Sequence, residues 1–252
     1  MSEAPDTVRR FSGLADRYDR YRPGYPPEAI AAILAGLPPH AVVADVGAGT
    51  GISTRALREA GAAAFALEPN DEMRAFAGDT GVEIRAGSAE ATGLGARSVD
   101  AVTCFQAFHW FANAAAVREF ARVLRPGGRL AIVWNERDLA DAFSAGFRDI
   151  EQRYSPPDLL AGAHFKDERL EPLLREGGFT NVRLRTFANA QRLDREATLG
   201  RMRSTSYAPR EGPDLERMTH DLLALFERCR DDAGHVFLRY VTEVWTAEPE
   251  NA

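Results

Sequence analysis

The sequence predicts an α/β protein in which helices cover both faces of a mostly parallel sheet. Short apolar runs alternate with amphipathic segments along most of the chain, the pattern of parallel strands joined by crossover helices. A glycine-rich turn, residues 45–51, joins the first apolar run to a helical segment. The 252 residues, 45% of them hydrophobic, are enough to bury a full core and suit one elaborated domain.

The N-terminal half begins with an arm, residues 1–26, that is rich in polar and aromatic residues. Prolines and a glycine in residues 18–26 argue against a continuous helix there. Pro27 starts the first predicted helix, and the pair Pro38-Pro39 ends it. The predicted helices are residues 27–37, 52–60, 70–76 and 114–124. The predicted strands between them are residues 41–46, 63–67, 82–85, 101–105 and 130–134.

Beyond residue 135 the alternation loosens. Helices are predicted over residues 139–154, 168–175, 194–204 and 214–230, and strands over residues 179–187 and 235–245. We divide the single domain, residues 1–252, into the arm (1–26), a ligand-binding core (27–135) and two insertions (136–178 and 189–234). The insertions are expected to form a lid, because specificity elements sit on loops that a rigid sheet carries.

Composition and charge narrow the classes of partner. The net charge of -6 provides no global basic field, so nucleic acid is not expected as a main partner. No stretch approaches the roughly 20 apolar residues of a membrane span, and residues 1–10 lack the apolar centre of a signal peptide. Two cysteines are too few for a secreted disulfide framework, and the five histidines show no metal-ligand spacing. We therefore expect a cytoplasmic monomer or homodimer that binds neither a membrane nor a metal.

The turn Asp45-Val46-Gly47-Ala48-Gly49-Thr50-Gly51 carries the predicted chemistry. Such a turn brings backbone N–H groups close to a nucleotide-like ligand. The dinucleotide pattern G-x-G-x-x-G would require glycine or alanine at Ile52, which disfavours an NAD-dependent oxidoreductase. The chain contains no Gly-Lys-Ser or Gly-Lys-Thr, which excludes a Walker A loop. Asp45 either takes part in ligand binding or caps the turn.

An acidic residue follows the second predicted strand. Glu68 lies close to the offset of about 20 residues at which an acid meets ribose hydroxyls in nucleotide-binding sheets. A carboxylate accepts two hydrogen bonds from a vicinal diol, and it would repel a 2′-phosphate. The sequence therefore predicts a ligand with a free ribose.

Taken together, these motifs resemble those of the class I S-adenosylmethionine (SAM)-dependent methyltransferases, in particular the small-molecule group called methyltransferase type 11. The matching segments are residues 43–51, Glu68, residues 87–90, residues 106–111 and residues 124–130. The resemblance covers about residues 11–135 well and the remainder loosely. It implies a Rossmann-like sheet of seven strands whose last strand, here residues 235–245, is antiparallel.

The resemblance also implies roles for individual residues and SAM as the cofactor. Gly47, Gly49 and Gly51 would pass beneath the methionine part of SAM, and Glu68 would hold the ribose. The remaining cofactor-binding candidates are Met73, Ser88, Ala89 and Glu90 beside the adenine, Gln106 near the methionine amino group, and Tyr18 and Arg22 of the arm over the carboxylate. The insertions would then cover a small-molecule methyl acceptor.

A general base is needed only if the acceptor must lose a proton. His109, just past the fourth predicted strand, is the candidate because neutral imidazole can accept a proton near pH 7. A histidine in such a position is more often a packed residue of an aromatic loop than a base. Two other functions remain open at this stage: a SAM-binding protein that does not methylate, and an NAD-dependent oxidoreductase.

Overall fold

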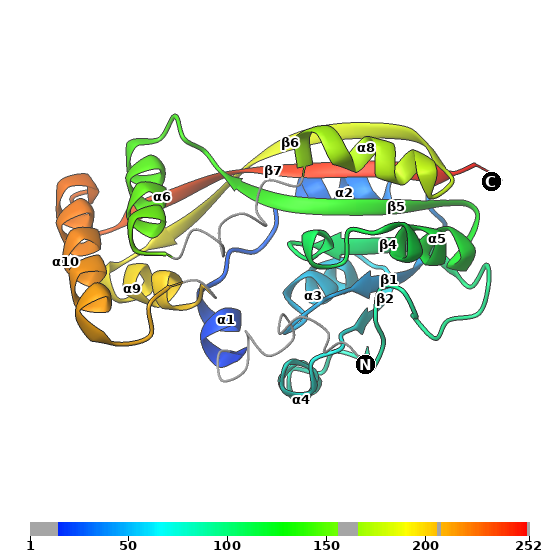
Figure 1. Cartoon of the computed structure of the whole chain (residues 1–252), viewed down its shortest axis with the longest axis horizontal. Coiled ribbons are helices and arrows are strands. Elements are labelled where there is room, and N and C mark those ends of the chain that lie inside the picture. Colours follow the sequence, from blue (N-terminus) through cyan, green and yellow to red (C-terminus); the bar gives the residue numbers. More distant parts are fainter. Residues whose placement is uncertain (1–14, 156–165, 206–207, 251–252) are drawn as a thin grey trace.

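The computed structural model of the chain describes residues 15–155, 166–205 and 208–250. It contains a seven-stranded sheet with the strand order β3-β2-β1-β4-β5-β7-β6 (Figure 1). Strands β1 to β5 are parallel to one another, whereas β7 is antiparallel to both β5 and β6. The strands are β1 (Val42–Val46), β2 (Ala63–Leu67), β3 (Ile84–Arg85), β4 (Val99–Phe105), β5 (Leu124–Arg137), β6 (Phe179–Leu193) and β7 (Val236–Pro249). The predicted fold class, including the antiparallel last strand, is confirmed.

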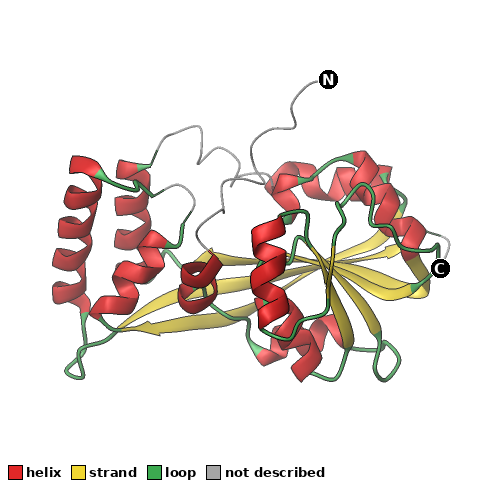
Figure 2. Cartoon of the chain, turned by 90° about the horizontal axis from the view of Figure 1, so that it is seen from below, coloured by secondary structure: helices red, strands yellow, loops and turns green. Residues whose placement is uncertain are grey.

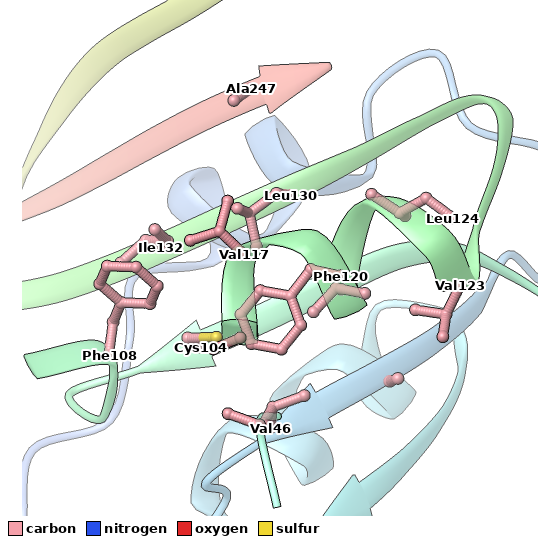
Figure 3. Close-up of a cluster of buried hydrophobic side chains, with 14 of the residues drawn as sticks. Val46, Cys104, Phe108, Val117, Phe120, Val123, Leu124, Leu130, Ile132 and Ala247 are labelled. Carbon is pink, nitrogen blue, oxygen red and sulfur yellow. The ribbon is translucent and has the colours of Figure 1, made fainter. Parts of the chain in front are cut away.

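Alternate residues of the central strands face opposite sides of the sheet, and each side has its own core. One core joins Ala44 and Ile132 to helices α5 (Ala114–Val123) and α8 (Lys166–Glu176). In Figure 3, Val117 and Phe120 of α5 lie over Cys104 of β4. The opposite core joins Val43 and Val133 to helices α2 (Pro27–Leu34) and α3 (Ile52–Glu59). Helices thus cover both faces of the sheet (Figure 2).

A third core lies beyond one end of the parallel strands, where β5, β6 and β7 extend past the rest of the sheet (Figure 1). Helices α6 (Ala142–Tyr154), α9 (Arg195–Arg203) and α10 (Gly212–Cys229) gather there, and we refer to these three helices as the helical layer. Phe147 of α6, Leu222 of α10 and Leu238 of β7 are fully buried in this core. The extended strands therefore attach the helical layer to the sheet.

The insertions differ from their predicted extents. The β6–β7 ladder continues to the pair Leu193↔Val236, so β6 runs six residues past its predicted end at residue 187. Most side chains of β6 are exposed or half-buried. The strand therefore lacks the apolar run that predicts the central strands. The expected lid segment 136–178 is split between two places. Its helix α6 joins the helical layer, while Leu170 and Leu174 of α8 pack into the core that also contains α5.

The arm contains a helix that the sequence did not predict, α1 (Ala15–Tyr21). The helix ends two residues before Pro23, in keeping with the steric restriction that proline places on the residue before it. Residues 23–26 form neither helix nor strand, and Pro27 opens α2 as predicted. Within the described residues, no helix is both long and apolar enough to cross a bilayer.

Candidate active site

The glycine turn connects β1 to α3 at the carboxyl end of the sheet. Its first half is held against β2, because the backbone N–H groups of Gly47 and Ala48 both donate to the carbonyl of Leu67, at 2.8 and 3.3 Å. Gly51 then takes a left-handed conformation (φ 83°) at the N-cap of α3. The turn therefore lies at the edge where open α/β sheets bind their ligands.

Two glycines of this turn have different surroundings. Gly47 has φ +71°, and a Cβ atom there would lie 2.8 Å from the Cβ of Ala107 and 3.1 Å from the Phe111 ring. Gly49 has φ +56°, yet a Cβ atom there would meet nothing within 4 Å. Gly47 therefore lets the turn pack against the loop after β4, while the space beside Gly49 is open to a ligand.

Glu68 lies directly beside the open glycine. Its Oε2 atom accepts a hydrogen bond from the Gly49 N–H at 2.9 Å, and its Oε1 atom accepts one from the Asn70 N–H at 2.9 Å. The side chain is 8% exposed. Burial raises the pKa of this carboxyl, and the two backbone hydrogen bonds partly oppose that shift. The acid and the turn, predicted from separate motifs, therefore meet at one place.

Asp45 supports the turn from within the core. It is fully buried, and its carboxylate accepts hydrogen bonds from the hydroxyls of Ser53 (2.6 Å), Thr54 (2.7 Å) and Thr103 (2.9 Å). Burial raises its pKa to about 6, and the three hydroxyl donors limit the rise. Asp45 thus ties β1 to the start of α3 and to β4. Of the two roles that the sequence left open for Asp45, this enclosed position favours support of the turn, and direct contact with a ligand stays an untested prediction.

The candidates for the adenine side come from α4 (Asp71–Asp79) and the loop after β3. Met73 is buried in the first turn of α4, where its N–H donates to the capping Asn70 side chain at 2.9 Å. Ala89 is buried in the core that contains α5 and α8, while Ser88 is half-buried and Glu90 is exposed. The Glu90 carboxylate accepts a hydrogen bond from Asn113 at 2.8 Å. Only Met73 and Ala89 of this set offer buried apolar surface.

Two candidates follow β4. Gln106 has φ 53°, a left-handed conformation that is uncommon for a residue other than glycine, and its side-chain nitrogen donates to the Asn135 carbonyl at 3.3 Å. His109 lies in a short 3₁₀ helix, Phe108–Trp110, is half-buried, and has its ring centroid 4.6 Å from that of Trp110. The neighbouring Phe108 points into the core (Figure 3).

The arm reaches the glycine turn through a residue that the sequence analysis missed. Arg55 of α3 donates to Asp19 of α1 at 2.5 Å and to the carbonyl of Thr50 at 2.9 Å. The predicted pair from the arm is also close together, because the Arg22 guanidinium lies 4.6 Å from the centroid of the Tyr18 ring. Arg22 also donates to the carbonyl of Ser204, just past α9, at 3.3 Å. The arm therefore contacts both the core and the helical layer.

Asn135 of β5 and its neighbours, which the sequence also did not predict, hold the arm at Gly24. Asn135 is 8% exposed, donates to the Gly24 carbonyl at 3.1 Å, and accepts from Thr242 at 2.6 Å. Asn189 of β6 donates to the same Gly24 carbonyl at 3.0 Å. The only sequence signal was a polar residue directly after the apolar run 130–134, because the partners are far away in the chain.

The Rossmann-like sheet, with β7 inserted antiparallel between β5 and β6, is the fold of the solved methyltransferases that resemble this chain. Residues 44–132 match the family described as a methyltransferase domain. The matched segment contains the glycine turn, Glu68, Gln106 and His109, and in this segment the chain is similar to that family.

Curated relatives of the chain are methyltransferases as well. The chain is 46% identical over 137 residues to an uncharacterized methyltransferase of Mycobacterium tuberculosis, a match that covers 53% of this chain and 55% of that protein. It is 36% identical over 165 residues to a malonyl-[acyl-carrier protein] O-methyltransferase of Methylococcus capsulatus, covering 60% of this chain and 58% of the relative. The matched stretches span little more than half the length of these curated relatives.

Among solved structures, the fold is similar to that of a phosphoethanolamine N-methyltransferase from Haemonchus contortus in complex with phosphomonomethylethanolamine and S-adenosylhomocysteine. The TM-score is 0.61 at 15% sequence identity, and the match covers 99% of this chain and 60% of that chain. At this identity the likeness concerns the fold alone.

Proposed function

We propose that this protein transfers a methyl group from SAM to a small-molecule acceptor. The observation that carries the proposal is the 2.9 Å contact between the Glu68 carboxylate and the Gly49 N–H, next to open space at the carboxyl ends of β1 and β2. The family match over residues 44–132 supports methyl transfer as the chemistry.

The residues around Gly49 suit a bound SAM. The Glu68 carboxylate can accept hydrogen bonds from a ribose diol, and Gly49 leaves room for a ligand to approach the backbone. Met73 and Ala89 supply buried apolar surface for an adenine. Gly47, Gly51, Ser88, Glu90 and Gln106 are the further proposed contacts, with Tyr18 and Arg22 over the carboxylate. Arg22 suits that place because guanidinium binds carboxylate through two parallel hydrogen bonds.

When bound, SAM supplies a methyl group that is already activated by the sulfonium charge. What the chain must provide is alignment, which can lower a barrier by roughly 7 to 11 kcal/mol in the best cases. Asp45 and Arg55 contribute by fixing the turn to α3, β4 and α1. The helical layer and the arm are the proposed lid, because they lie past the ends of the strands that carry the site (Figure 1).

Glu68→Ala is expected to weaken SAM binding by about 1.5 to 3 kcal/mol, or about 10- to 150-fold in Kd, because charged hydrogen bonds to the ribose are lost. Titration calorimetry measures the change. Glu68→Gln, which keeps one carbonyl acceptor, should lie between the wild type and Glu68→Ala. Glu83→Ala is the matched control, because Glu83 is an exposed acid just before β3 that pairs with Arg85 at the surface. An unchanged Kd in a folded Glu68→Ala protein would remove Glu68 from the site.

Methyl transfer itself is tested by incubating the protein with SAM and a metabolite extract and measuring S-adenosylhomocysteine. Turnover supports the proposal. Saturable SAM binding without any S-adenosylhomocysteine would instead favour a binding protein that does not methylate, and binding of NAD but not SAM would favour an oxidoreductase.

His109 is the proposed general base, because its ring is half-buried in the loop that follows β4 at the site. His109→Ala is expected to lower kcat by about 100-fold or more while leaving the Kd for SAM unchanged, the range typical of a lost acid or base. His40→Asn is the control, since His40 is exposed and lies before β1, at the opposite end of the strand from the glycine turn. A kcat for His109→Ala within twofold of the wild type contradicts this role.

A further inference from the structure

A small pocket of about 200 Å³ lies between the arm and the helical layer. It is lined by Arg17, Arg203, Pro209, Arg210 and Leu215. Its volume is below the range of about 300–1,000 Å³ that encloses drug-sized ligands, so it suits one end of a molecule better than a whole one. Three of its five lining residues carry a guanidinium group.

The packing of α1 on α9 brings two of these arginines together. The Tyr21 ring lies against Gly200, and the Tyr21 hydroxyl donates to Glu196 at 3.3 Å. Arg17 lies one turn before Tyr21 on α1, and Arg203 lies one turn after Gly200 on α9. Both arginines line the same pocket, beside the contact between α1 and α9.

The three guanidinium groups have no protein partner within residues 15–155, 166–205 and 208–250, where no carboxylate pairs with Arg17, Arg203 or Arg210. Other arginines of α1 and α10 do pair, since Arg20 lies 3.7 Å from Glu196 and Arg217 lies 2.6 Å from Asp214. The three arginines are exposed, so solvent screens part of their mutual repulsion, but three like charges around one pocket still repel each other. An anionic group would remove the repulsion.

The chemistry of the lining defines the ligand. Guanidinium binds carboxylate and phosphate oxygens through paired hydrogen bonds, and Leu215 and Pro209 can contact a short carbon segment. Arg17 is two residues from Asp19, the residue that joins α1 to Arg55 and so to the Thr50 carbonyl of the glycine turn. The pocket therefore belongs to the same arm that contacts the proposed cofactor site.

We propose that this arginine pocket binds a carboxylate or phosphate group of the methyl acceptor, so that the acceptor is a small organic anion. The inference rests on the proposed function. It assigns to Arg17, Arg203 and Arg210 the recognition of the acceptor, separate from the residues proposed to hold SAM.

The first part of the test measures anion binding directly, with hexanoate and hexyl phosphate as probes and 1-hexanol as the neutral probe of equal chain length. Titration followed by protein NMR is expected to show saturable binding of at least one anion. Its affinity should fall at least about 10-fold in R203Q, and it should also fall at higher salt. R203K should lose part of this affinity, because lysine keeps the charge but not the planar fork. R217Q, which changes a paired arginine of α10, is the control and should bind like the wild type. If R203Q binds the anions as tightly as the wild type, or if hexanol binds as tightly as the anions, the pocket is not an anion-binding site.

The second part separates an acceptor site from a site for an unrelated anion. Labelled methyl transfer from SAM is measured into a metabolite extract that has been divided on an anion exchanger. We expect label in the retained, anionic fraction and a loss of at least about 10-fold in the double variant R17Q/R203Q, with an unchanged Kd for SAM. Label confined to the unretained fraction, or equal labelling by the double variant, overturns the assignment. Failure of the wild type to bind SAM or to transfer any label counts against the proposed function instead.

Discussion

Replacing Glu151 by alanine is expected to lower the free energy of unfolding by about 3 to 5 kcal/mol, because it leaves a buried guanidinium without its counter-ion. Glu151 of α6 and Arg137 at the end of β5 form an ion pair of 2.6 Å, and their side chains are only 5% and 13% exposed. Arg137 also lies over the rings of Phe147 and Tyr240, at 4.5 and 5.6 Å from their centroids. Breaking the pair therefore affects the place where the helical layer joins the sheet.

Urea unfolding of the wild type, Glu151→Ala and Glu171→Ala measures this effect. Glu171 pairs with Arg175 on the surface of α8, where both side chains are about half exposed, so its removal should change the midpoint little. The double variant Arg137→Met/Glu151→Leu should recover much of the lost stability, because it removes both charges and fills the space with apolar atoms. A midpoint for Glu151→Ala no lower than that of Glu171→Ala would show that the pair is not buried in solution.

The parts of the fold that the sequence predicted well have strong local patterns. The strands β1, β2 and β4 are mostly apolar, because helices cover both faces of the sheet, and the glycine turn occupies consecutive residues. The meeting of Glu68 with Gly49 also followed, since residues that end adjacent parallel strands lie at one edge of the sheet.

The parts that could not be predicted depend on contacts between distant residues. Asp19, Arg55 and Asn189 look like ordinary polar surface residues until α1 and β6 are placed beside the core. The far end of β6 was missed because its side chains are mostly polar and its pairing with β7 is made by backbone atoms. The role of Asp45 stayed open between ligand binding and support of the turn, because the sequence does not reveal that three hydroxyls donate to its carboxylate.

Gly47→Ala is expected to destabilise the protein by about 2 to 5 kcal/mol, the sum of about 1–2 for a left-handed alanine and about 1–3 for overpacking. The new Cβ atom would lie 2.8 Å from the Cβ of Ala107, so the loop after β4 must move. Gly49→Ala has the same kind of backbone conformation but meets no protein atom within 4 Å, so only the first contribution of about 1–2 kcal/mol applies.

The same pair of variants separates packing from cofactor binding. The methyl group of Gly49→Ala would enter the open space beside the Glu68 carboxylate. If it crowds the ligand there, the binding free energy falls by about 1–3 kcal/mol, which is about 5- to 150-fold in affinity. Gly49→Ala should therefore bind SAM poorly in calorimetry while it unfolds at a urea concentration above that of Gly47→Ala. If Gly49→Ala binds SAM as tightly as the wild type, the ligand does not approach this glycine. If Gly47→Ala is the more stable of the two, the close contact with Ala107 does not exist in solution.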